Sequence, residues 1–239
     1  MKGRNDAVDH SLTTSRPMAL YSPATGSQAG LDHVLLTAGA LAGPVYIALG
    51  LGQALLRPGF DLTRHDLSLL SNGELGWVQI ANFVLSGLLV IAGAAGLWRT
   101  LGGGRGRTWG PLLLAGYGLG LIGAGLFVAD PAFGFPPGTP ADANSISWHG
   151  LVHILSAALG FAALIASCGV FSRRFNASRE SGWMGYSVLT GLVFLAGFVG
   201  VASGSGNSWS VIGFWIAVVL AWSWITAILL RYRRATRLD

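Results

Sequence analysis

Two polar segments hold the side chains best suited to chemistry, and the richer one runs from Asp130 to His153. It leaves one hydrophobic run, contains no Lys or Arg, and enters the next run with His149 and His153 four residues apart. Residues at this spacing lie one above the other on the same face of a helix. Such a pair can ligate a metal, fix the preceding loop by hydrogen bonds, contact a ligand, or relay a proton near neutral pH.

A zinc ion would need more than this pair. Catalytic zinc typically has about three protein ligands and one water, so His65, Asp66 or Asp130 would have to complete the set with His149 and His153. The helix lacks the glutamate that accompanies the histidine pair in zincin-type sites. The sequence therefore leaves zinc, the only cofactor it brings into question, open beside a loop-fixing role.

The second polar segment, RHDLSLLS at 64–71, predicts a short amphipathic or re-entrant helix. His65 and Ser68 are three residues apart and can touch, as a hydrolase base and nucleophile must. His65 and Asp66 are adjacent and point apart, which favours a helix cap or an Asp–Arg pair instead. The candidate catalytic residues are His65, Asp66, Ser68 and Asp130.

Asp130 ends a hydrophobic run and precedes Pro131, which cannot continue helical hydrogen bonding. At the bilayer edge it would be an ordinary helix-ending carboxylate. Inside the hydrocarbon it would cost about 2.5–3.5 kcal/mol, which favours a partnered, functional group.

The elements that must position these residues are membrane helices. The 239 residues are 52% hydrophobic and 10% charged, against roughly 25% charged in soluble domains. The 36 glycines suit helices that approach closely in lipid. The net charge of +5 does not indicate nucleic-acid binding, because the basic residues cluster at the ends of apolar runs. The single cysteine, Cys168, excludes an intrachain disulfide and a Cys-based zinc site.

About 20 apolar residues span the roughly 30 Å of hydrocarbon in a bilayer. Runs of this length predict an all-α, polytopic bundle of six transmembrane helices near 34–56, 76–98, 109–129, 149–171, 183–202 and 209–230. We expect three parts: a flexible cytoplasmic tail at 1–30, the helical domain at 31–232 and a basic cytoplasmic tail at 233–239.

The distribution of basic residues predicts the orientation. Thirteen of the 15 Lys and Arg residues fall in the termini and the second and fourth connections, and only Arg57 and Arg64 fall in the others. Cytoplasmic loops retain such residues, so both termini should be cytoplasmic and the protein should lie in a cell membrane of the bacterial inner-membrane type. Tryptophans at 77, 148 and 209 should then mark the outer interface.

Both polar segments lie on the predicted outer face, and this shared side favours one pocket. It would bind a small or lipidic ligand, and its contacts would be His65, Asp66, Asp130, Trp148, His149 and His153. Membrane lipid is the other partner expected, and nucleic acid is not. Whether the protein is an enzyme, and whether it forms oligomers, stays open, as does a purely structural or scaffolding role.

Three stretches resemble the integral membrane family known as domain of unknown function 998. They are RPGFDLTRHDLSLLSNGELG in the first outer connection, ANFVLSGLLVIAGAAGL in the second helix, and FVADPAFGFPPG followed by SWHGLVH. The resemblance covers about residues 34 to 230 and implies six helices without implying an activity. The positions that match its polar motifs are His65, Asp66, Ser68, Asp130, Pro131, His149 and His153.

The residue types are also similar to those of intramembrane metal-dependent hydrolases of the alkaline ceramidase and adiponectin receptor type. That resemblance implies the enzyme alternative, metal-assisted hydrolysis of a lipid amide or ester. This chain departs from the type because it has six predicted helices rather than seven and its third histidine comes from a loop.

Overall fold

The computed structural model describes residues 26–143, 145–204 and 206–235, and in them the chain is all-helical. Each long helix is mostly apolar along its length because its charged residues lie near its ends, as a membrane-spanning segment requires. The elements are α1 (Gly26–Leu56), the short 3₁₀ helix η1 (Leu67–Ser71), α2 (Gly76–Thr100), α3 (Trp109–Leu126), α4 (Trp148–Ala177), α5 (Ser181–Gly204) and α6 (Ser208–Ala235).

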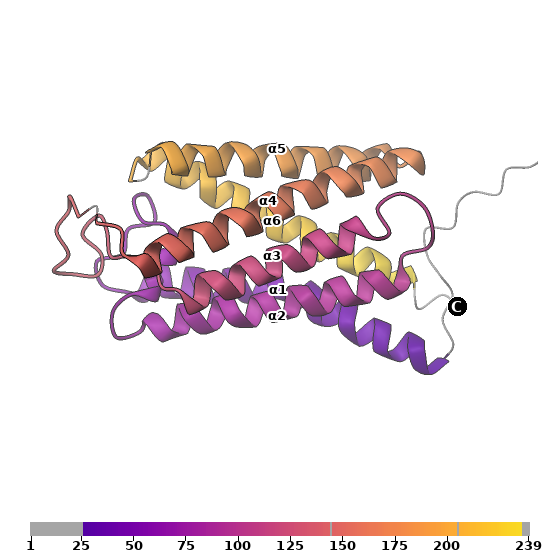
Figure 1. Cartoon of the computed structure of the whole chain (residues 1–239), viewed down its shortest axis with the longest axis horizontal. Helices are drawn as coiled ribbons and strands as arrows, with labels where there is room; N and C mark the ends of the chain where they lie inside the picture. The colour runs from indigo at the N-terminus through magenta and orange to yellow at the C-terminus, as the bar shows by residue number, and fades with distance from the viewer. Residues whose placement is uncertain (1–25, 144, 205, 236–239) are drawn as a thin grey trace, which may run out of the picture.

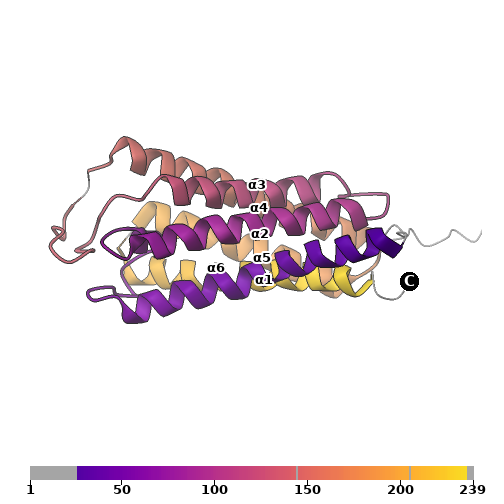
Figure 2. The same ribbon diagram turned by 90° about the horizontal axis from the view of Figure 1, so that it is seen from below.

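The six α-helices form a closed up-and-down bundle. Each packs against the next in the sequence, and α6 returns to pack against α1 (Figures 1 and 2). All six are long and apolar enough to cross a membrane. The prediction of a multi-pass, six-helix membrane protein is therefore confirmed.

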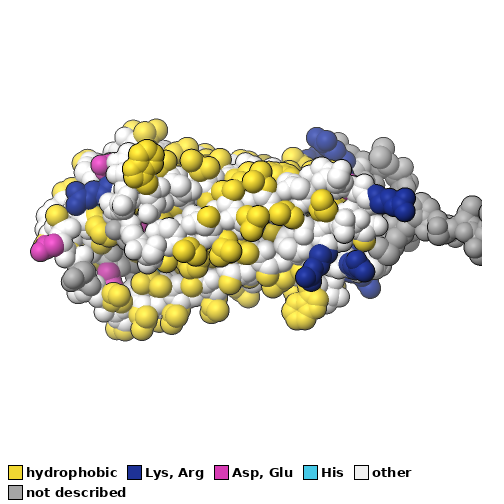
Figure 3. Space-filling view, turned by 90° about the horizontal axis from the view of Figure 1, so that it is seen from above, with side chains coloured by type: hydrophobic (Ala, Val, Ile, Leu, Met, Phe, Trp, Pro, Cys, Tyr) yellow, Lys and Arg dark blue, Asp and Glu magenta, His cyan; other side chains and the backbone are white. Residues whose placement is uncertain are grey.

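The bundle has two chemically different ends. At the polar-loop end lie the connections 57–75 and 127–147 and the short turn between α5 and α6. At the basic end lie the start of α1, the end of α6 and the other two connections. Figure 3 shows most Lys and Arg side chains gathered at the basic end, with hydrophobic side chains covering the surface between the ends.

Glycines set the closest helix contacts. A Cβ atom on Gly87 would lie 2.6 Å from the carbonyl oxygen of Gly118, and one on Gly120 would lie 2.6 Å from the Cα atom of Gly160. No side chain fits at these distances, so α2, α3 and α4 pack backbone against backbone. Small residues allow such contacts in lipid, where apolar burial does not drive helix association.

Three helix boundaries move well outward from their predicted positions. α6 ends at Ala235, inside the predicted basic tail at 233–239, and the other two boundaries move because polar residues at the basic end find partners. α1 begins at Gly26, inside the predicted tail, and Asp32 in its early turns forms an ion pair with Arg99 of α2. The rest of that tail, residues 1–25, lies outside the described residues. α4 continues to Ala177 because Arg174 is fully buried, donating to the carbonyl oxygen of Arg105 at 2.9 Å.

Candidate functional site: a cavity at the polar-loop end

The three connections of the polar-loop end meet at Phe133. Its carbonyl oxygen lies 3.1 Å from Nε2 of His65, and a Cβ atom on Gly206 would lie 2.8 Å from its ring. Phe133 has φ of 55°, a conformation that residues other than glycine adopt uncommonly. The three connections of the polar-loop end therefore converge, as a shared site requires.

His65 holds this junction, and both of its ring nitrogens are engaged in hydrogen bonds. Its Nδ1 accepts a hydrogen bond from the backbone N–H of Asp61 at 2.9 Å, so Nε2 must carry the proton donated to Phe133. The ring is buried against Phe60 and Phe135. His65 is thus a neutral clamp between the 57–75 and 127–147 connections.

Asp130 belongs to the cap of α4. Its carboxylate accepts hydrogen bonds from the backbone N–H and the hydroxyl of Ser147, at 2.7 and 2.6 Å. The Ser147 hydroxyl oxygen in turn accepts from the N–H of Gly150 at 3.1 Å, as an N-cap side chain does. A negative charge at a helix N-terminus is favourable, so these contacts account for Asp130 as a structural residue.

The histidine pair divides into one exposed and one buried ring. His149 is exposed, and its ring lies edge-on to the exposed ring of Trp148 at a centroid distance of 3.5 Å. His153 is 6% exposed, and its Nδ1 lies 2.9 Å from the carbonyl oxygens of both Ala124 and Phe127. Nδ1 must carry a proton to donate to a carbonyl, so Nε2 of the neutral ring is an acceptor.

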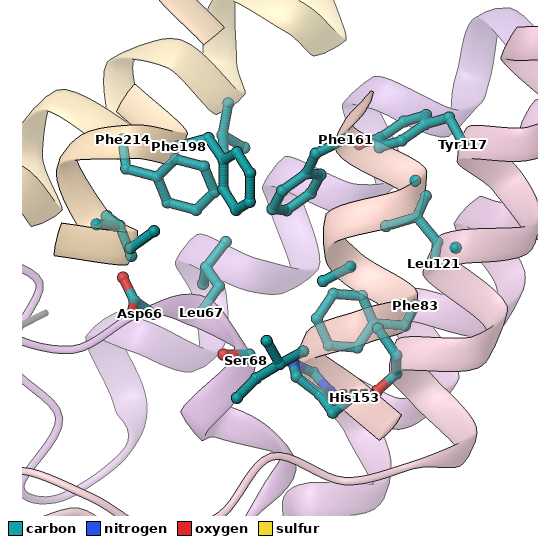
Figure 4. A pocket seen from close by; sticks show the side chains of 18 of the residues that line it. Asp66, Leu67, Ser68, Phe83, Tyr117, Leu121, His153, Phe161, Phe198 and Phe214 are labelled. Carbon is teal, nitrogen blue, oxygen red and sulfur yellow. Dashed lines mark hydrogen bonds between the residues drawn. The ribbon is translucent and has the colours of Figure 1, made fainter. Parts of the chain in front are cut away.

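A cavity of about 350 Å³ lies inside the bundle next to His153 (Figure 4). All six helices and η1 contribute to its lining, which is mostly apolar. Its aromatic walls are Tyr46, Phe83, Tyr117, Phe161, Phe198 and Phe214. The Phe161 ring packs edge-on against Phe198 and Phe214, at centroid distances of 5.3 and 5.6 Å, and so joins α4 to α5 and α6.

A few polar groups also reach the cavity, and two of them lack partners. Asp66 and Ser68 enter from the 57–75 connection, and Trp215 enters from α6. Asp66 Oδ1 and Trp215 Nε1 are buried without a hydrogen-bond partner among the described residues. Removal from water raises the pKa of the Asp66 carboxyl to about 6, because burial disfavours the charged form.

The sequence matches the family described as "Protein of unknown function (DUF998)" over residues 40–231. The chain belongs to the DUF998 family. The match begins inside α1 and ends inside α6, so it includes both polar connections and every element that lines the cavity. No curated protein and no solved structure matches this DUF998 chain.

The structure brings together only some of the predicted site residues of this DUF998 protein. Asp66, Ser68 and His153 line the cavity. His65 lies behind them as the clamp. The other predicted contacts, Asp130, Trp148 and His149, are not among the lining residues. The aromatic walls from α5 and α6 were absent from the sequence prediction, because phenylalanines in apolar helices carry no signal that separates a cavity from a lipid-facing surface.

The predicted zinc set is spread over different surroundings. In the part of the chain that the structure describes, no three His, Cys, Asp or Glu side chains form a group that could hold a metal ion. Both nitrogens of His65 are engaged elsewhere, so this ring neither ligates a metal nor takes a proton from Ser68 in this arrangement. The zinc site and the hydrolase alternative stay predictions.

Proposed function

We propose that this DUF998 protein binds a small apolar or lipidic ligand in the cavity between its helices. The observation that carries the proposal is the cavity itself, which combines aromatic walls with a few polar groups, two of them without partners. Ligand sites typically have volumes of about 300–1,000 Å³ and this mixture of lining. A cavity of about 350 Å³ suits one small molecule or a single chain rather than a whole phospholipid.

The rim of the cavity supports a ligand that arrives from the bilayer. Ile154 of α4 lines the cavity and is 50% exposed, and Ala202 of α5 lines it and is also exposed. Both lie on helices that would cross the membrane. An opening between α4 and α5 would therefore face acyl chains rather than water.

We also propose that both termini are cytoplasmic and that the cavity lies in the outer half of a cell membrane of the bacterial inner-membrane type. The support is the excess of Lys and Arg in the termini and in the connections of the basic end, where cytoplasmic loops retain positive charge. Exposed tryptophans at both ends, such as Trp209 and Trp109, suit the two membrane interfaces.

Native mass spectrometry of protein released from the membrane in mild detergent tests the proposal. We expect the wild type to retain a small apolar molecule and Ala157→Trp, which places a large ring in the cavity, to lose it. Leu159→Trp is the matched control, because Leu159 lies on the same helix and is exposed away from the cavity. Equal retention by the wild type and Ala157→Trp, or retention by neither, would count against a ligand in this cavity.

A further inference from the structure

The charges around the cavity point to the chemical class of its ligand. We infer that the ligand is a protonated amine carrying a single alkyl chain, with its ammonium group at Asp66 and its chain among the aromatic walls. This inference rests on the proposed function, since it specifies what the cavity binds.

Asp66 is an acid without a counter-charge. It precedes η1 but makes no side-chain capping bond, and its Oδ1 is buried without a partner. The two ion pairs of the described residues, Arg99 with Asp32 and Arg231 with Glu180, lie at the basic end. A buried carboxylate without a partner is costly, and a ligand cation would offset that cost.

The second polar group at this side of the cavity is also an acceptor. Nδ1 of His153 is committed to the carbonyl oxygens of Ala124 and Phe127, which leaves Nε2 to accept a hydrogen bond. Figure 4 shows Asp66, Ser68 and His153 along the same side of the cavity. The Ser68 hydroxyl can donate or accept, but a ligand group that bonds to both Asp66 and His153 must donate, and an ammonium group carries three donors.

The remaining lining also favours a cation over an anion. No Lys or Arg is among the described lining residues, so an anion would face the Asp66 carboxylate with only neutral donors such as Trp215 Nε1–H to help it. Aromatic faces attract cations within about 6 Å of the ring centroid. The walls therefore suit both an ammonium group and an alkyl chain.

The shape of the cavity argues for a single chain. The polar groups and the exposed rim residues Ile154 and Ala202 lie toward the polar-loop end, whereas Phe161 and Phe198 form walls deeper in the bundle. An amphiphile that entered between α4 and α5 would place its head at Asp66 and its tail along these rings. A short amine from water would lack the contacts to the walls.

Photoaffinity labelling separates the head-group classes. The probes are an alkyl amine, an alcohol and a carboxylate with the same twelve-carbon diazirine chain, together with a propyl amine diazirine, each added to protein in zwitterionic lipid nanodiscs. Labelling of the cavity helices is normalised to labelling of Leu192, which is exposed on α5 and outside the cavity. We expect the long amine to exceed the alcohol by about tenfold, as a charge-assisted hydrogen bond predicts, and to exceed the carboxylate and the short amine by more.

Variants test the role of Asp66. Asp66→Asn should reduce amine labelling to the level of the alcohol and leave alcohol labelling unchanged, whereas Asp61→Asn, in the same connection but outside the lining, should change neither. Equal labelling by amine and alcohol in the wild type, or an amine preference that survives in Asp66→Asn, would overturn the amine inference but not the proposed function. Labelling of Leu192 without labelling of the cavity by any probe would overturn both.

Discussion

Asp66 is predicted to destabilise the ligand-free protein at neutral pH. Its carboxylate makes no capping bond, and one of its oxygens is buried without a partner. Loss of water contact raises its pKa to about 6 from the ordinary value of 3.8. The substitution Asp66→Asn keeps the shape of the side chain and removes the charge, so it should stabilise the fold.

The size of the effect follows from the shifted pKa. A change from 3.8 to about 6 corresponds to about 3 kcal/mol, since one pKa unit is about 1.4 kcal/mol. Asp66 keeps some solvent contact, and screening reduces the expected gain to about 1–2 kcal/mol. For a chain of this length, we expect the Tm of Asp66→Asn at pH 8 to exceed that of the wild type by about 2–8 °C.

The gain in stability of Asp66→Asn over the wild type must depend on pH. The folded-state pKa of Asp66 lies above the unfolded value, so the folded protein takes up a proton more readily than the unfolded chain. The wild type therefore gains stability as pH falls through about 6 toward 3.8, and its difference from Asp66→Asn should shrink to nearly zero.

Thermal unfolding of the ligand-free protein in detergent between about pH 4 and pH 8 measures this difference, since that window spans the folded-state pKa of about 6 and ends near the ordinary value of 3.8. Asp61→Asn is the control of opposite sign. The Asp61 carboxylate accepts hydrogen bonds from the N–H and hydroxyl of Thr63 at 2.8 and 2.7 Å, and these bonds lower its pKa. Asp61→Asn should be less stable than the wild type by a nearly constant amount between about pH 4 and pH 8, because that deficit disappears only as pH falls below the ordinary pKa of 3.8. A destabilised Asp66→Asn at pH 8, or a gain that is constant with pH, would refute the reasoning.

Three further predictions concern the frame around the cavity. Arg174→Ala should lower stability by about 2–4 kcal/mol, seen as a lower Tm, because it removes a fully buried side chain that donates to carbonyl oxygens of the α2–α3 connection, including the buried one of Gly102. An unchanged Tm would contradict this role. Gly87→Val should cost about 1–3 kcal/mol by forcing α2 from α3, whereas Gly52→Ala, with open space around it, should not lower the Tm. His65→Ala should speed amide hydrogen exchange in the 127–147 connection, and His149→Ala should not; equal exchange in the two variants would argue against the clamp.

The six helices could be predicted from the sequence because each is encoded by one continuous run of residues. A run of about 20 apolar residues is enough to predict a spanning helix, and each of the six predicted spans overlaps an observed helix. Asp66 and His153 stood out because polar side chains are rare beside such runs. The boundaries at Gly26 and Ala177 were missed because the partners of Asp32 and Arg174 come from other helices.

The site was harder to predict because it depends on how deep in the bundle a residue lies as well as on the helix face that it occupies. His149 and His153 share a face of α4, but His153 lies against carbonyl oxygens at the end of α3. His149 is one turn farther out, past that end, and is exposed. The cavity walls at Phe198 and Phe214 come from helices whose order around the bundle the sequence does not encode in any local pattern.

The central claim is that the cavity holds an amphiphile. The most direct measurement is a crystal structure of the protein grown from a lipid mesophase with dodecylamine. We expect elongated density that starts beside Asp66 and runs deeper into the bundle along Phe161. A cavity filled only by water, or closed by the surrounding side chains, would contradict the account.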